Sequence, residues 1–132
     1  MPQILLIEDQ PNQRALYEQE LSDEGYDVLC ASNGRDGFEL FLRHHPQLVI
    51  VDVLLPGMNG IEVMERMLSA DPNIPIIVHS AYSSPRHDYI TWFARAYVVK
   101  SGDLGELKKQ VQNALSGTPV VETQDRTGLV SA

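Results

Sequence analysis

The sequence predicts a single α/β domain built on a parallel β-sheet with helices on both faces. Five short apolar runs alternate with helical segments, an order that requires right-handed crossovers between parallel strands. The runs are apolar at consecutive positions, as in strands that are buried on both faces. Polar residues gather where the runs end. The strands are expected at residues 4–7, 27–31, 48–51, 74–80 and 96–99.

The first two helices are marked by the residues at their ends. The first is expected over about residues 10–24, and Gly25 ends it. The strand at residues 27–31 has the weakest pattern of the five. The second helix opens at Asn33 and stops before Pro46, because the residue before a proline avoids the helical conformation.

The strand at residues 48–51 has the most apolar pattern, and its last residue is followed by Asp52. Pro, Gly and Asn residues between positions 56 and 60 then predict a loop. Apolar residues recur at helical spacing over residues 61–70, and Asp-Pro-Asn at 71–73 ends that helix. In open parallel sheets the carboxyl ends of the strands form the ligand crevice, so Asp52 is expected at the functional edge.

The second half of the chain repeats the pattern twice. The strand at residues 74–80 has its proline only near the start, where the missing N–H does least harm. A short helix is expected at about residues 86–94, and the strand at residues 96–99 ends at Lys100.

The last helix has both start and stop signals. Asp103 and Glu106 are spaced as an N-cap and N3 pair, and Gly117 ends the helix. The residues beyond it mix Pro, Gly, Thr and charges without periodicity. We therefore expect one domain over residues 1–117 and a flexible tail over residues 118–132.

Composition excludes several function classes. The 132 residues carry a formal net charge of -8 and no Lys/Arg-rich run, which disfavours direct nucleic-acid binding. No apolar run approaches the ~20 residues needed to cross a membrane, and the N-terminus lacks a signal peptide. A cytoplasmic location is expected. Cys30 is assigned no role, and solvated or capping roles are expected for His44, His45, His79 and His87.

Polar side chains at the ends of four strands are expected to meet at one edge of the sheet. Each alone has an ordinary explanation, since a strand-terminal Asp often forms a turn and a Lys is usually solvated. Three carboxylates, a hydroxyl and an ammonium at the ligand-binding edge point instead to a functional site. These residues are Glu8, Asp9, Asp52, Ser80 and Lys100.

From about residue 3 to 116 the chain resembles a response-regulator receiver domain of bacterial two-component signalling, similar to the stand-alone chemotaxis receivers. The matching motifs are Glu8-Asp9, Asp52 followed after one residue by Leu-Leu-Pro-Gly-Met-Asn-Gly, Ser80-Ala81, and Tyr97-Val98-Val99-Lys100. The resemblance implies a flavodoxin-like, doubly wound five-stranded sheet in the order 2-1-3-4-5.

The resemblance also implies a metal site. By the family pattern Asp9 and Asp52 ligate Mg²⁺ directly, Glu8 does so through water, and the backbone carbonyl of Leu54 supplies another oxygen. Mg²⁺ prefers such hard oxygen ligands and coordinates phosphate oxygens. Mn²⁺ is expected to be able to substitute for it.

The remaining roles concern phosphorylation. Asp52 is the implied phosphoacceptor, Lys100 neutralises a phosphoryl oxygen, and the Ser80 hydroxyl donates to another. In this family Ser80 then moves toward the phosphoryl group, and an aromatic residue at the position of Tyr97 turns inward. The face made by the fourth helix, fifth strand and fifth helix would change with them.

Four residues depart from the family pattern. Ser101 stands where the family has a proline with a cis bond, and cis costs ~2.5–4 kcal/mol without proline, so a trans bond is expected. Phe93 replaces a usual glycine, and the fourth helix is expected to be truncated or displaced. Leu54 and Tyr82 are bulky at positions that control loss of the phosphoryl group, which predicts slow self-dephosphorylation.

The function expected is a single-domain switch phosphorylated by a histidine kinase or phosphotransfer protein. It would bind a protein target through the face named above, without direct nucleic-acid binding or membrane insertion, as a monomer or weak homodimer. A phosphorylation-independent scaffold with the receiver fold is one alternative. An aspartate-nucleophile phosphohydrolase is less favoured because Leu54 replaces a required Asp. The acidic loop at residues 8–12 disfavours a nucleotide or flavin carrier.

Overall fold

The computed structural model describes residues 1–53, 55, 58–81 and 93–117. Within these residues five parallel strands form one sheet in the order β2-β1-β3-β4-β5. The fold class and strand order expected above are therefore confirmed. The strands are β1 (Gln3–Ile7), β2 (Asp27–Ala31), β3 (Leu48–Val51), β4 (Ile76–Ser80) and β5 (Ala96–Val99).

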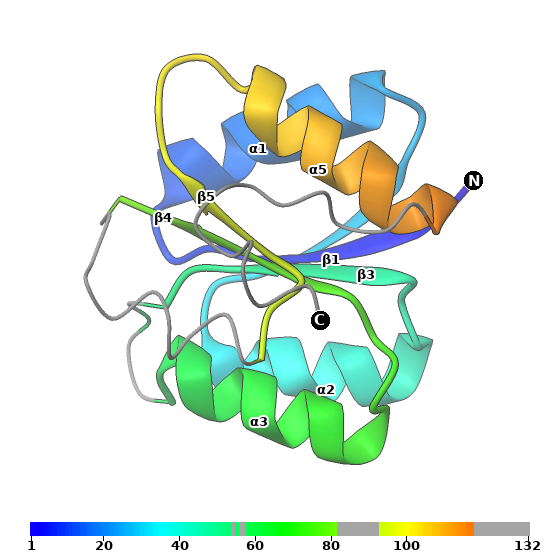
Figure 1. Ribbon diagram of the computed structural model, residues 1–132. Coiled ribbons are helices and arrows are strands. Elements are labelled where there is room, and N and C mark those ends of the chain that lie inside the picture. The colour runs from blue at the N-terminus through cyan, green and yellow to red at the C-terminus, as the bar shows by residue number, and fades with distance from the viewer. Residues whose placement is uncertain (54, 56–57, 82–92, 118–132) are drawn as a thin grey trace, which may run out of the picture.

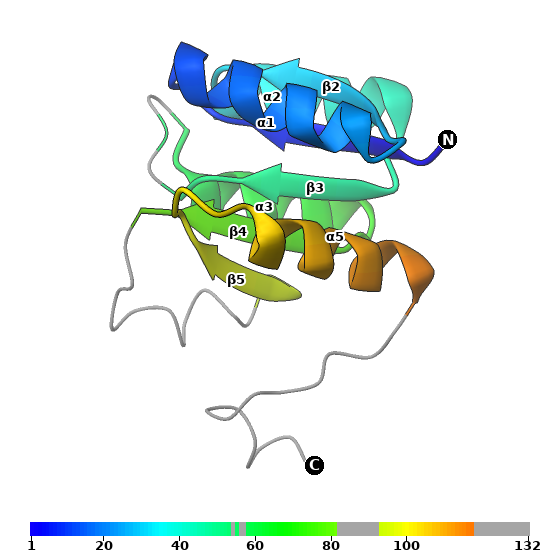
Figure 2. The same ribbon diagram turned by 90° about the horizontal axis from the view of Figure 1, so that it is seen from above.

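Helices cover both faces of the sheet. In Figure 1 α1 and α5 lie above the sheet and α2 and α3 below it, and Figure 2 shows the same layers from above. None of the helices in the described ranges is long and apolar enough to cross a membrane. The helices are α1 (Pro11–Asp23), α2 (Gly34–His44), α3 (Gly60–Ala70) and α5 (Gly105–Ser116).

Two apolar cores explain why the central strands are apolar at every position. In β1, Ile4 and Leu6 pack on the α1/α5 side, whereas Leu5 and Ile7 pack on the α2/α3 side. The residues of β3 divide between the two cores in the same way. Each such side chain, fully buried, contributes about 2 kcal/mol, so a polar residue in the middle of either strand would be costly.

Side chains and a glycine fix the ends of three helices. Asn33 Oδ1 accepts from the Asp36 N–H at 2.8 Å and caps α2, as the sequence predicted for the start of this helix. Asn59 Oδ1 accepts from the Glu62 N–H at 2.9 Å and caps α3 in the same way. Gly25 follows the end of α1 with φ 98°, a conformation that glycine adopts at no steric cost.

The start of α5 differs from the prediction. The helix begins at Gly105, without a side-chain cap on the preceding residue, so the proposed N-cap and N3 pair is wrong. Asp103 Oδ1 accepts instead from the Gly105 N–H at 2.9 Å, and Ser101 Oγ bonds both the N–H and the carbonyl of Asp103. This local turn uses Asp103 before the helix starts, since Asp readily bonds backbone two residues on. Glu106 accepts from Gln110 at 2.8 Å.

Other boundaries are also refined. β4 begins at Ile76 rather than residue 74; Pro75 has no N–H to donate, although its carbonyl accepts from Val49 N at 3.1 Å. Residues 86–92 of the helix expected at about 86–94 lie outside the described ranges, as does the tail at 118–132. Phe93 and Ala94 are described and are not helical, so the predicted helix end is wrong. The Lys100–Ser101 bond is trans, as expected.

Candidate functional site

The register of the sheet aligns the strand ends that carry polar residues. Ile7 of β1 pairs with Val51 of β3, and Ser80 of β4 pairs with Val99 of β5. Ser80 itself and the residues that follow Ile7, Val51 and Val99 therefore lie at one edge of the sheet, as the parallel arrangement predicted. The side chains positioned there are Glu8, Asp9, Asp52, Ser80 and Lys100.

Three carboxylates form a cluster at this edge. Glu8, Asp9 and Asp52 each offer an oxygen, and these oxygens all lie within 4.8 Å of one another. Glu8 is 2% exposed and Asp52 7% exposed, whereas Asp9 is half-buried. Carboxylates this close and this poorly hydrated repel one another unless a cation lies among them.

Lys100 supplies positive charge to this cluster. Its Nζ lies 2.8 Å from Glu8 Oε1 and 2.8 Å from Asp52 Oδ2, and its side chain is 11% exposed. A third bond of 2.8 Å joins Nζ to Gln13 Oε1 of α1. Burial alone would lower the pKa of Lys100, but the bonds to Asp52 and Glu8 outweigh it and raise the pKa.

Gly60, the first residue of α3, keeps the segment after Asp52 close to the sheet. A Cβ at this position would come within 2.5 Å of the Asp52 carbonyl oxygen and of Val53 Cα. The Gly60 N–H also donates to the Val53 carbonyl at 3.1 Å. Only glycine permits this close approach of backbone to backbone, so Gly60 helps to fix the direction in which Asp52 leaves β3.

Arg14 and Gln10 fix the loop that carries the other two carboxylates. The Arg14 guanidinium donates to the Glu8 carbonyl at 2.9 Å and lies 3.5 Å from the Asp9 carbonyl. The Gln10 N–H donates to Glu8 Oε2 at 3.2 Å. Glu8 is thus held from two sides, by its own loop and by Lys100.

A family model described as the response regulator receiver domain matches residues 4–112. The chain belongs to this family. The resemblance stated from the sequence motifs is confirmed, and the chain carries a receiver domain of two-component response regulators.

Curated relatives of this receiver domain belong to longer proteins. The chain is 34% identical over 114 residues to the regulatory protein AtoC of Escherichia coli, covering 85% of this chain and 25% of AtoC. It is 33% identical over 132 residues to the response regulator ArlR of Staphylococcus aureus, covering 98% of this chain and 59% of ArlR. The chain thus spans a quarter of one relative and somewhat over half of the other.

Solved structures agree with the family. The response regulator protein TrrA of Thermotoga maritima, in complex with Mg²⁺–BeF, is 39% identical with a TM-score of 0.83, covering 87% of this chain and all of TrrA. TrrA in complex with histidine kinase ThkA matches at the same identity with a TM-score of 0.81, covering 87% of this chain and 99% of the other.

Two residues expected to take part in switching lie on β4 and β5. Ser80 ends β4, is fully buried, and its carbonyl accepts from the Lys100 N–H at 2.7 Å. Tyr97 is half-buried in β5 and packs against the α2/α3 core. Leu54 and Tyr82 lie outside the described residues, so the expected backbone ligand and the predicted slow dephosphorylation stay predictions.

Gln13 is a site residue that the sequence reasoning missed. It lies on α1, four residues before the buried Tyr17 and eight before the buried Leu21, so all three share the face that covers the sheet. A polar residue on an otherwise sheet-facing stripe is the signal that could have drawn attention to it. Its partner could not be read from the sequence, because the contact to Lys100 spans 87 positions.

The prediction of solvated or capping roles is wrong for His79. This residue is 2% exposed in β4 and meets the Tyr17 ring edge-on at 4.8 Å. Burial, and then the Lys100 charge, lower the pKa of His79 to about 4. His44 and His45 are exposed at the end of α2, and His87 lies outside the described residues.

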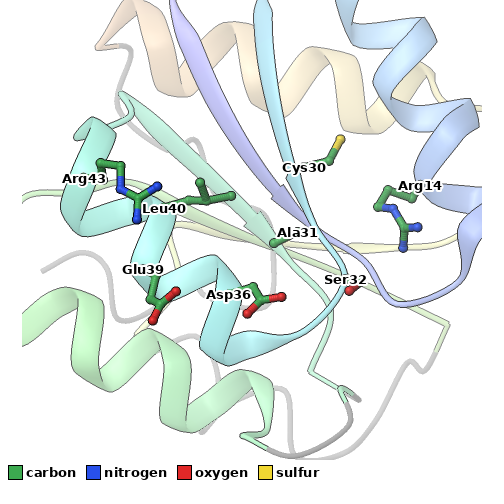
Figure 3. Close-up of a pocket in the computed structure, with 8 residues that line it drawn as sticks. All are labelled: Arg14, Cys30, Ala31, Ser32, Asp36, Glu39, Leu40 and Arg43. Atoms are coloured by element: carbon green, nitrogen blue, oxygen red, sulfur yellow. The ribbon is translucent and has the colours of Figure 1, made fainter.

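A separate surface pocket lies at the edge strand β2, between α1 and α2. Figure 3 shows Cys30 and Arg14 toward one side of it and the α2 side chains Asp36, Glu39 and Arg43 toward the other. Burial and the neighbouring Glu18 raise the pKa of the Cys30 thiol to about 12. A thiol that stays protonated is a poor nucleophile, which agrees with the absence of a role assigned to Cys30.

Proposed function

We propose that this receiver domain accepts a phosphoryl group on Asp52 in a Mg²⁺-dependent reaction, with a histidine kinase or phosphotransfer protein as donor. The observation that carries the proposal is the 2.8 Å bond from Lys100 Nζ to Asp52 Oδ2 within a cluster of three carboxylates. The complex of TrrA with histidine kinase ThkA supports the nature of the donor.

The chemical step is a displacement at phosphorus. A carboxylate oxygen of Asp52 forms a bond to phosphorus while the bond from phosphorus to the donor imidazole nitrogen breaks, and the nitrogen keeps that electron pair. Lys100 then places its ammonium against a phosphoryl oxygen, and the Ser80 hydroxyl donates to another. Such groups position the reactants and neutralise charge, which is most of what catalysis of phosphoryl transfer requires.

The acidic cluster fits a divalent cation. Mg²⁺ takes oxygen ligands at about 2.0–2.1 Å in octahedral geometry, so small side-chain movements would bring oxygens now within 4.8 Å of one another to one ion. In the proposal Asp9 and Asp52 ligate directly and Glu8 acts through water. Bound there, Mg²⁺ would shield the charge between carboxylates and phosphate; Mn²⁺ is the proposed substitute. The complex of TrrA with Mg²⁺–BeF supports this choice.

The response to phosphorylation would pass through β4 and β5. Ser80 lies next to Lys100 in the sheet, since their backbones share a 2.7 Å bond. Movement of Ser80 toward a phosphoryl group would therefore shift β5, where the partly buried Tyr97 packs against the α2/α3 core. We propose that β5 and α5 form the target-binding face together with the expected fourth helix, which falls on residues outside the described ranges.

The test is incubation of the purified protein with acetyl phosphate and Mg²⁺, followed by intact-mass measurement. The parent should gain the mass of one phosphoryl group, and Asp52→Ala should gain none. Asp23→Ala is the matched control, because Asp23 is exposed at the far end of α1; it should react like the parent. A parent that gains no mass would contradict the proposal and favour the phosphorylation-independent scaffold. An Asp52→Ala variant that gains the mass equally would contradict the assignment of Asp52 and place the phosphoryl group on another residue.

A further inference from the structure

Helix α1 contributes a neutral oxygen to the ammonium of Lys100. An ammonium has three N–H donors, and Lys100 Nζ has three oxygen partners at 2.8 Å, on Glu8, Asp52 and Gln13. Two of these partners belong to the acidic cluster. Gln13 is the partner that lies outside it and carries no charge.

Gln13 is well placed to hold Lys100 because its backbone is fixed. It lies in the first turn of α1, and the Arg14 N–H beside it bonds to the Gln10 carbonyl at 2.8 Å. Tyr17 and Leu21, further along the same face, are buried against the sheet and anchor the helix. The amide of Gln13 is therefore presented to the strand ends by a rigid element, a requirement for precise positioning of a reacting group.

The two charged partners of Lys100 are the ones that must change during phosphorylation. Asp52 is proposed to ligate a divalent cation and to form the bond to phosphorus, and Glu8 is proposed to reach the cation through water. Neither can then keep its present bond to Lys100 unchanged. Gln13 is proposed neither to bind the cation nor to form a bond to phosphorus. Its bond to Lys100 can therefore persist while the other two N–H groups of Lys100 turn to phosphoryl oxygens.

We propose that Gln13 is a positioning residue that holds the Lys100 ammonium beside Asp52 through the phosphoryl transfer. This inference rests on the proposed function. The alternative is that Gln13 only fills space, which would also explain its partial burial. Replacing it would then change the stability of α1 but not the position of Lys100. The two roles are separated by what happens when Lys100 is absent.

The first measurement is the rate of phosphorylation by acetyl phosphate at saturating Mg²⁺. Gln13→Met keeps the length of the side chain and removes the oxygen. Because hydrogen bonds to charged groups are strong, the rate should fall about tenfold. Gln13→Asn, which withdraws the amide from Lys100, should also be slow. Gln19→Met is the matched control, since Gln19 is exposed on the same helix and bonds to Asp23; it should react at the parental rate.

The second measurement tests whether the effect passes through Lys100. In a Lys100→Met background, Gln13→Met should produce no further loss of rate. In the unphosphorylated protein, the ¹H–¹⁵N signal of the Lys100 ammonium should be sharp in the parent and broadened by faster exchange with water in Gln13→Met. Melting curves identify any variant that fails to fold.

The outcomes separate the two proposals. If the parent is phosphorylated and Gln13→Met reacts at the parental rate, the role of Gln13 is refuted and the proposed function stands. An equal loss of rate in the Lys100→Met background would also refute it. If the parent takes no phosphoryl group, the proposed function fails, and an unchanged Lys100 signal in Gln13→Met would show separately that Gln13 does not hold the ammonium.

Discussion

Replacing Lys100 with Met should destabilise the protein strongly when no divalent cation is present. The change removes the ammonium that bonds Glu8 and Asp52, whose side chains are 3% and 9% exposed, and leaves both carboxylates without it. Removing one partner of a buried ion pair costs about 3–5 kcal/mol. Taking about 3 kcal/mol, the melting temperature should fall by roughly 12 °C for a domain of this size.

The assay is thermal unfolding followed by circular dichroism at pH 7.5, with EDTA or with Mg²⁺. Mg²⁺ should raise the melting temperature of Lys100→Met by more than that of the parent, because the cation no longer competes with an ammonium. Lys109→Met is the control, since Lys109 is exposed on α5, and should melt like the parent. A Lys100→Met variant that melts at the parental temperature in EDTA would refute the assignment of Lys100 as counter-charge.

The sign of the pH dependence follows from the raised pKa of Lys100. A group whose pKa is higher in the folded protein stabilises it fully below its ordinary value, here 10.5, and this stabilisation is lost as the pH rises through the folded value. The difference between parent and Lys100→Met should therefore be constant between pH 7 and 9 and shrink only in strong alkali.

Two further substitutions test the site and its surroundings. Asp9→Asn should stabilise the cation-free protein by about 1 kcal/mol, because it relieves repulsion among the carboxylates without removing a bond to Lys100, and Mg²⁺ should reverse the order; destabilisation in EDTA would contradict this. His79→Leu should flatten the acid side of the stability profile measured by urea unfolding. In the parent the pKa of His79 is lowered from 6.5 to about 4, so its contribution is present above pH 6.5 and about 3 kcal/mol is lost as the pH falls toward 4. If His79→Leu loses as much stability toward pH 4 as the parent does, the assignment of this loss to His79 is refuted.

The strand-end cluster could be predicted from the sequence because each of its members is fixed locally. Glu8, Asp52 and Lys100 directly follow apolar runs, and a parallel sheet brings the carboxyl ends of its strands to one edge whatever the details of packing. The sequence pattern therefore predicted a parallel sheet and the edge at which these residues lie, whereas the strand order was implied by the resemblance to the receiver family. It did not predict that Lys100 would bond two carboxylates at once, since that depends on side-chain conformation.

Residues whose environment depends on packing between layers were harder to predict. The contact of Gln13 with Lys100 requires the rotation of α1 about its axis and its distance from the sheet, neither of which the weak apolar pattern of α1 defines. His79 is polar by type, yet its place in β4 turns it toward Tyr17 in the α1/α5 core. Near the start of α5, the Ser101 hydroxyl bonds the backbone of Asp103, and the Asp103 side chain accepts from the Gly105 N–H. Asp103 therefore belongs to a turn before the helix, which the sequence pattern did not predict.

If Asp52 is phosphorylated as proposed, the bonds of Lys100 would couple cation binding to phosphorylation. Three carboxylates and one ammonium, at -3 and +1, leave a formal charge of -2 at the site, which one divalent cation brings to zero. That cation would draw on Asp52 directly and on Glu8 through water, and Lys100 bonds an oxygen of each of these carboxylates. We infer that cation binding releases two N–H donors of Lys100 at the place where phosphoryl oxygens arrive. In the role proposed for Gln13, its bond to the third N–H would keep the released ammonium beside Asp52.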